Sequence, residues 1–154
     1  MSDARWTEIQ SAVTSAARHF SSAKTIYDDL RDGKSELELY VIEMAFMHAM
    51  QSGHSSLENA LVNILNLFDE APPSGANWHA DLIARVGQKV GARPPVLSPE
   101  LSKAANETRQ FRHVAARAYD SFDWNRAAVA VEQAAVIAAR LPDAIGRFRT
   151  ATDP

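Results

Sequence analysis

The fold is decided by one long stretch, SELELYVIEMAFMHAMQSGHSSLENALVNILNLFDE, which occupies residues 35–70. Apolar residues recur in it at steps of three and four, which is the period of an α-helix. They cover more than one face of the predicted helix, as expected for a central helix that neighbours contact on several sides. Ser35 followed by Glu38 predicts a capping box at its start.

The rest of the chain has the same helical character, and no segment alternates as a strand does. Further helices are predicted over residues 4–31, 77–90, 98–122 and 123–148. Gly33 suits a left-handed C-terminal cap, whereas Ser98 and Asp123 suit N-terminal caps. Pro142 is expected to kink or break the last helix. The sequence therefore predicts one all-α domain over residues 1–154, an antiparallel up-and-down helical bundle of four long helices plus one short helix.

Composition excludes several classes of site. The 154 residues include no cysteine, which rules out disulfides, thiolate nucleophiles and cysteine-containing zinc sites. No apolar run approaches the ~20 residues of a membrane span, so we expect a soluble, cytoplasmic protein with no membrane partner. Residues 1–70 hold 11 acids and 5 bases, whereas residues 71–154 hold 8 acids and 11 bases. A site for an anion is therefore expected in the second half.

The stretch NETRQFRHVAARAYDSFD, residues 106–123, places polar and basic side chains on one side of a helix. This predicted basic face consists of Arg109, Arg112, His113, Arg117 and Tyr119. Guanidinium groups gathered in this way suit a phosphate ligand. The alternative is an ordinary solvated helix face, since many surface helices carry several arginines and a histidine.

A second, polar cluster interrupts the apolar helix at Gln51, His54 and Glu58. His54 and Glu58 are four residues apart and can pair on one helix face. Buried polar groups need partners, so the cluster either bonds internally and to a neighbouring helix or lines a cleft. His79 and His19 are interpreted as structural, because they form no metal-ligand spacing with each other. No metal and no cofactor is expected.

The chain contains no glycine-rich phosphate loop, no HExxH and no GxSxG. Catalysis would therefore depend on acid, base and electrostatic groups, for which the basic face is the candidate. Metal-independent RNA cleavage is such a reaction, because the 2′-hydroxyl of the substrate is the nucleophile.

Four blocks of sequence carry a resemblance to a known family: HSSLENALVNI at 54–64, PSGANWHADLI at 73–83, ARPPVLSPEL at 92–101 and FRHVAARAY at 111–119. In this order they resemble the HepT-like ribonuclease toxins of the HEPN superfamily. The resemblance implies a helical bundle that forms a homodimer and acts on RNA at the dimer cleft. It also implies a partner, a minimal nucleotidyltransferase that serves as antitoxin.

The active motif of that family is Arg, four residues, His, one residue, Tyr. On this sequence the arginine is Arg112 and the tyrosine is Tyr119, but Arg117 occupies the histidine position. The resemblance implies that Tyr119 is the hydroxyl that the nucleotidyltransferase adenylylates. Arginine binds phosphate but almost never gives up its proton, so His113 is the candidate to transfer protons instead.

Three interpretations are open, and the first two follow from this departure. The first is a toxin that binds RNA through Arg109, Arg112 and Arg117 at a dimer cleft. It either cleaves the RNA, with Arg112 and Arg117 stabilising the phosphorane and His113 moving protons, or binds it without cleavage. The second is a catalytically inactive helical protein that serves as the binding partner of a nucleotidyltransferase. A plain structural bundle is the third. We expect low or absent cleavage, because a neighbouring histidine rarely reproduces a catalytic geometry.

Overall fold

The computed structural model describes residues 4–115 and 122–153, and within these ranges the fold is all-α, as predicted. The elements are α1 (Ala4–Thr25), a π-helical turn η1 (Ile26–Leu30), α2 (Glu36–Leu67), α3 (Trp78–Val86), α4 (Pro99–Ala115) and α5 (Trp124–Thr152). The described residues contain no strand, only an isolated bridge between Val90 and Arg93. No helix in these ranges is both long enough and apolar enough to cross a membrane.

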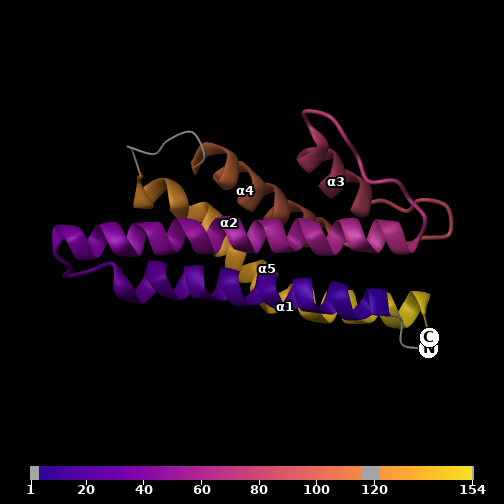
Figure 1. Ribbon diagram of the computed structural model, residues 1–154, viewed down its shortest axis with the longest axis horizontal. Coiled ribbons are helices and arrows are strands. Elements are labelled where there is room, and N and C mark those ends of the chain that lie inside the picture. Colours follow the sequence, from indigo (N-terminus) through magenta and orange to yellow (C-terminus); the bar gives the residue numbers. More distant parts are fainter. Residues whose placement is uncertain (1–3, 116–121, 154) are drawn as a thin grey trace.

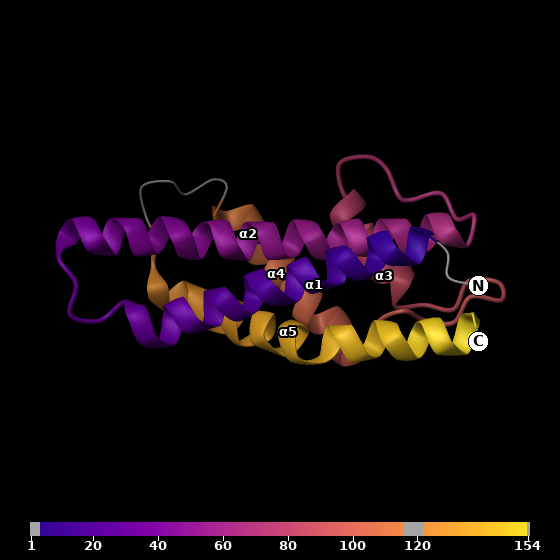
Figure 2. The same cartoon turned by 60° about the horizontal axis from the view of Figure 1, so that its bottom comes forward.

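Successive long helices run in opposite directions along the molecule (Figure 1). α1 and α2 lie side by side, and α5 returns along α1, so that the start of α1 and the end of α5 lie at the same end of the molecule (Figure 2). α4 packs against α5 and α2, and the short α3 packs against α4 and α2. α2 is therefore the central helix that its apolar sequence predicts.

Local side-chain chemistry begins the helices where the sequence predicts. Ser35 accepts a hydrogen bond from the Glu38 N–H at 3.2 Å, and the Glu38 carboxylate accepts one from the Ser35 N–H at 3.3 Å, which confirms the capping box. Asp123 caps α5 through the Asn125 N–H at 2.9 Å. Gly33 follows η1 with a φ of 69°, in the left-handed region that glycine adopts without strain.

Pro142 does not break α5, and the helix runs to Thr152, beyond the predicted end at residue 148. A proline inside a helix removes one backbone hydrogen bond and costs about 3 kcal/mol or more. Leu141, Ile145 and Phe148 are all buried on the two sides of that position. Each apolar side chain of this size stabilises the fold by about 1.5–3 kcal/mol when buried, and together they offset the cost.

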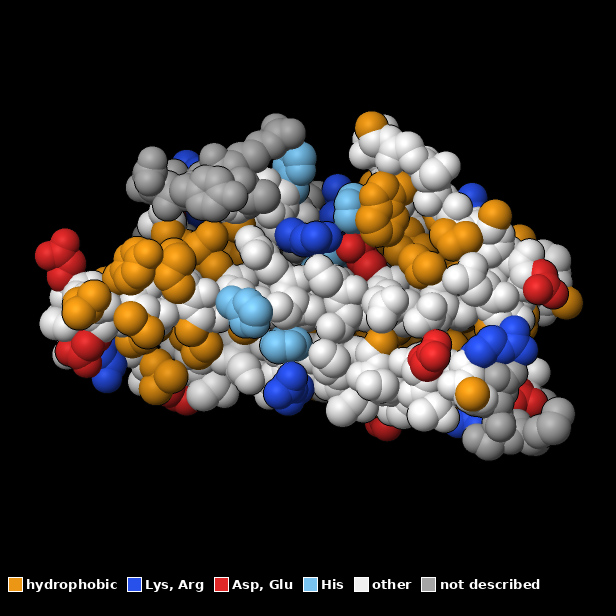
Figure 3. Space-filling model, in the orientation of Figure 1, with side chains coloured by type: hydrophobic (Ala, Val, Ile, Leu, Met, Phe, Trp, Pro, Cys, Tyr) orange, Lys and Arg blue, Asp and Glu red, His pale blue; other side chains and the backbone are white. Residues whose placement is uncertain are grey.

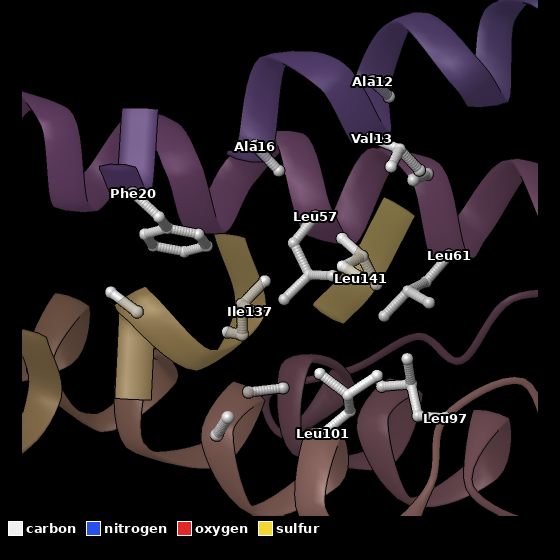
Figure 4. Close-up of a cluster of buried hydrophobic side chains, with 14 of the residues drawn as sticks. Ala12, Val13, Ala16, Phe20, Leu57, Leu61, Leu97, Leu101, Ile137 and Leu141 are labelled. Atoms are coloured by element: carbon white, nitrogen blue, oxygen red, sulfur yellow. The ribbon is translucent and has the colours of Figure 1, made fainter. Parts of the chain in front are cut away.

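The core lies between α1, α2, α4 and α5 (Figure 4). Its labelled side chains include Phe20 of α1, Leu57 and Leu61 of α2, and Ile137 of α5. A Cβ atom at Gly53 would lie 2.7 Å from two ring carbons of Phe20. The absence of a side chain at Gly53 thus allows the Phe20 ring to pack directly against the α2 backbone.

A buried arginine fixes the connection between α3 and α4. Arg93 is almost fully buried, and its guanidinium pairs with the Glu70 carboxylate beyond the end of α2. It also donates to the carbonyl groups of Arg85, Gln88 and Pro94 at 2.9–3.2 Å. Because these bonds join the end of α2 to the loop after α3, they hold α3 in a fixed position beside α2.

Candidate functional site

A cleft of about 630 Å³ opens between α2, the start of α3 and α4. Figure 3 shows basic and histidine side chains gathered in this hollow, with an acidic side chain below them. The residues that line the cleft are His54, Ala76, Asn77, His79, Ala80, Arg109, Gln110, Arg112 and His113. Members of the predicted basic face and of the predicted polar cluster therefore belong to the same surface.

The carboxylate of Glu58 joins the helices beneath this cleft. Glu58 is 4% exposed, and its Oε1 accepts a hydrogen bond from Arg112 Nη1 of α4 at 3.0 Å. Its Oε2 accepts a hydrogen bond from His79 Nδ1 of α3 and lies 3.4 Å from His54 Nε2. One buried carboxylate thus contacts a cationic or N–H group from each of three helices.

These neighbours decide the charge of Glu58. Burial alone would raise the pKa of the Glu58 carboxyl group, but the proximity of His54 and then of His79 outweighs it. The pKa of Glu58 lies below its usual value as a result. The group is therefore ionised at neutral pH and acts only as a hydrogen-bond acceptor.

His54 is fully buried and its ring orientation is fixed from two sides. Its Nδ1 lies 2.8 Å from the hydroxyl oxygen of Thr108, and that hydroxyl donates to the Ala105 carbonyl at 3.1 Å. The contact with Thr108 leaves His54 Nε2 beside the Glu58 carboxylate. The His54 ring therefore connects α2 to α4 next to the Glu58 carboxylate.

His79 lines the cleft and contacts Glu58, whereas the sequence analysis assigns it only a structural role. Its ring is half-exposed at the start of α3, bonds to Glu58 through Nδ1 and stacks on Trp78 with ring centroids 3.7 Å apart. The signal was the block PSGANWHADLI, which carries His79 in the resemblance. Nothing in the local spacing relates it to Glu58, 21 residues earlier.

The described members of the basic face lie together. Arg109, Arg112 and His113 all line the cleft, and Arg109 Nε is held by the Asn106 side-chain oxygen at 3.1 Å. Arg117 and Tyr119 lie outside the described residues, so their predicted roles stay predictions. Gln51 is half-buried and does not line the cleft that the described residues form.

The cleft is lined by groups that suit an anion and by groups that can accept or donate protons. Two guanidinium groups and two accessible imidazoles surround it, and the positive end of α3 contributes its first turn. Within the described ranges, no group of three or more histidine, aspartate or glutamate side chains is arranged to hold a metal ion. Such a set of residues can bind a phosphodiester and transfer protons at it.

Comparison with known proteins identifies a family. A family model described as HepT-like protein matches residues 45–152, which include every residue of the cleft. No curated protein matches the chain. No solved structure matches it either.

Proposed function

Because the chain belongs to the HepT-like protein family, we propose that it is the toxin component of a toxin–antitoxin pair and acts on RNA in the cytoplasm. The cleft between α2, α3 and α4 is its binding site, and cleavage there needs no metal ion. One observation carries this proposal: Arg109, Arg112 and two histidines line a single cleft above a buried carboxylate.

The arginines suit the phosphodiester backbone. A guanidinium has five N–H donors, so the bond from Arg112 to Glu58 leaves further donors for a ligand. Arg112 is also 37% exposed, and Glu58 holds it at the cleft. Arg109 adds a second charge one turn away. Together they can stabilise the negative charge that develops on phosphorus during attack by the 2′-hydroxyl.

We further propose that the protein is a homodimer, as the resemblance to HepT-like toxins implies. The N-terminal half of α2 carries an apolar patch of Leu37, Tyr40, Val41 and Met44, which are 73, 58, 57 and 40% exposed. Figure 3 shows hydrophobic side chains gathered at this end of the molecule. A contiguous apolar patch on a helix face is typical of a protein interface, and a second copy of the chain is the proposed occupant.

The second candidate function is a catalytically inactive partner of a minimal nucleotidyltransferase, and Arg117 at the motif position favours it. In either case Tyr119 is the proposed site of adenylylation. A cognate nucleotidyltransferase with ATP is expected to label the wild type and not Tyr119→Phe. Labelling of Tyr119→Phe to the same extent would reject Tyr119 as the modified residue.

Binding is tested first, with a single-stranded 2′-O-methyl RNA that cannot be cleaved at its 2′-oxygen. We expect fluorescence anisotropy to show binding that weakens as salt rises, and Arg112→Ala to weaken it further. Arg140→Ala is the matched control, because Arg140 is exposed on α5 and pairs with Glu100 away from the cleft. Equal weakening by both variants, or no binding at low salt, would contradict the proposal.

Cleavage is tested with a mixed RNA pool in the presence of EDTA. Metal-independent cleavage by the wild type supports the toxin assignment, whereas binding without cleavage supports the inactive partner. Arg117→His then asks whether the family histidine adds activity, since a positioned acid or base typically contributes ~10²–10⁴-fold. An increase in this range would show that the motif position faces the substrate.

A further inference from the structure

We propose that His79, which belongs to no part of the HepT-like motif, is the proton acceptor for the 2′-hydroxyl, and that Glu58 is its positioning residue. The inference rests on the proposed RNA cleavage. It assigns the proton transfer to α3, whereas the motif arginine lies on α4.

The contact with Glu58 selects the tautomer of His79. Glu58 is ionised and can only accept, so the hydrogen bond between them requires a proton on His79 Nδ1. In the neutral ring the lone pair is then on Nε2. A ring prepared in this way is a base, and the carboxylate behind it stabilises the imidazolium that forms when Nε2 takes a proton.

Packing fixes the ring in addition to the hydrogen bond. The His79 ring stacks on Trp78 with an interplanar angle of 31°, and Trp78 itself packs against the core. The His79 side chain is 35% exposed and lines the cleft, so a ligand there can reach it. Orientation from two sides combined with exposure is what a proton acceptor needs.

The other two histidines of the cleft suit this role less well. His54 is fully buried, and its nitrogens face Thr108 and Glu58. His113 is exposed, and no hydrogen bond from another described residue orients its ring. His113 is therefore assigned the complementary task of donating a proton to the leaving group. Because His113 is exposed, it can take up a new proton from water.

The reaction balances with these two groups. The 2′-hydroxyl gives its proton to His79 Nε2, and its oxygen forms a new bond to phosphorus. The bond from phosphorus to the 5′-oxygen breaks, and the 5′-oxygen leaves with a proton from the His113 imidazolium. The products are a 2′,3′-cyclic phosphate and a 5′-hydroxyl end. Both histidines then return to their starting states by exchanging protons with water.

The deciding experiment compares His79→Gln with His48→Gln, a matched histidine on α2 that lies outside the cleft and contacts His19. Cleavage of single-stranded RNA in EDTA and binding of 2′-O-methyl RNA are measured for the wild type and both variants. We expect His79→Gln to lower kcat by ~10²–10⁴-fold with binding within about twofold of the wild type, and to flatten the acid limb of the pH profile. His48→Gln is expected to behave as the wild type.

A second readout is independent of catalysis. Nitrogen-15 NMR of the histidine rings is expected to show the Nδ1–H tautomer for His79 at neutral to mildly alkaline pH, and Glu58→Gln is expected to shift the ring toward the Nε2–H form. A slower cleavage by Glu58→Gln that accompanies this shift identifies Glu58 as the positioning residue. An unchanged tautomer would overturn the assignment to Glu58.

The outcomes separate this inference from the proposed function. If the wild type neither binds nor cleaves RNA, the proposed function fails and the inference with it. If it binds but does not cleave, the binding site stands and His79 is not a proton acceptor. Retained cleavage in His79→Gln overturns the inference alone. Parallel loss of binding and cleavage also overturns it, because His79 then acts in binding.

Discussion

The pH dependence of the stability of Glu58→Gln tests whether the ionised Glu58 carboxylate holds the site residues together. The substitution keeps the volume of the side chain but removes the charge on which Arg112, His79 and His54 converge. Removing one partner of a fully buried ion pair typically costs about 3–5 kcal/mol. Arg112 and His79 are 37 and 35% exposed and can turn to water, so we expect a loss of about 1–3 kcal/mol at pH 7.

The sign of the pH effect follows from the lowered pKa of Glu58. Its ionised form stabilises the fold fully above the unfolded-state pKa of about 4.3, and that contribution is lost as the pH falls through the lower folded-state value. The difference in the free energy of unfolding between the wild type and Glu58→Gln should therefore be largest at pH 7 and become smaller below about pH 4.3. Urea unfolding at fixed protein concentration measures it. A difference that stays constant from neutral to strongly acid pH would refute the reasoning.

Three further predictions concern packing, RNA affinity and assembly. Gly53→Ala is expected to lower the free energy of unfolding by about 1–2 kcal/mol, because overpacking against the neighbouring ring outweighs the gain in helix propensity. Gly146 is exposed and no atom lies near the methyl group that alanine would add, so Gly146→Ala should raise the free energy of unfolding by up to about 1 kcal/mol. Urea titration of both variants measures the two effects. Arg109→Ala should reduce the slope of log K against log salt for single-stranded RNA by about 0.7, and Arg140→Ala should leave it unchanged. Tyr40→Glu should give a monomer by sedimentation at micromolar concentration if the apolar patch of α2 is the dimer interface, and a mass equal to that of the wild type would reject that surface.

Sequence reasoning succeeds for the fold where the deciding interactions are local. Ser35 and Asp123 bond to backbone groups two or three residues away, so their types and positions suffice to predict where helices begin. It fails at Pro142, because the helix continues there through the burial of side chains against other elements. A local rule states the cost of proline but contains no term for contacts from the rest of the chain.

The same distinction explains the site. Helical periodicity predicts that Arg109, Arg112 and His113 share a face, and that His54 and Glu58 share another. It does not predict that the two faces meet, because Arg112 and Glu58 are 54 residues apart and their contact depends on how α2 and α4 pack. His79 escapes prediction for the same reason, since its partner lies on a different helix.

The convergence of these groups bears on whether the polar cluster is structural or functional. In a polar network that serves only the fold, we expect every polar group to be hydrogen-bonded within the protein. Replacing such a network by apolar side chains of similar volume often leaves the protein as stable or more stable. Here the inner part is buried and contains the hydrogen bond between His54 and Thr108. The outer part presents Arg112 and His79 to a cleft with about a third of each side chain exposed. Partial exposure weakens their contribution to stability, but it leaves one arginine and one oriented imidazole accessible to a ligand. That balance favours a site that binds an anion and transfers a proton over a purely structural cluster.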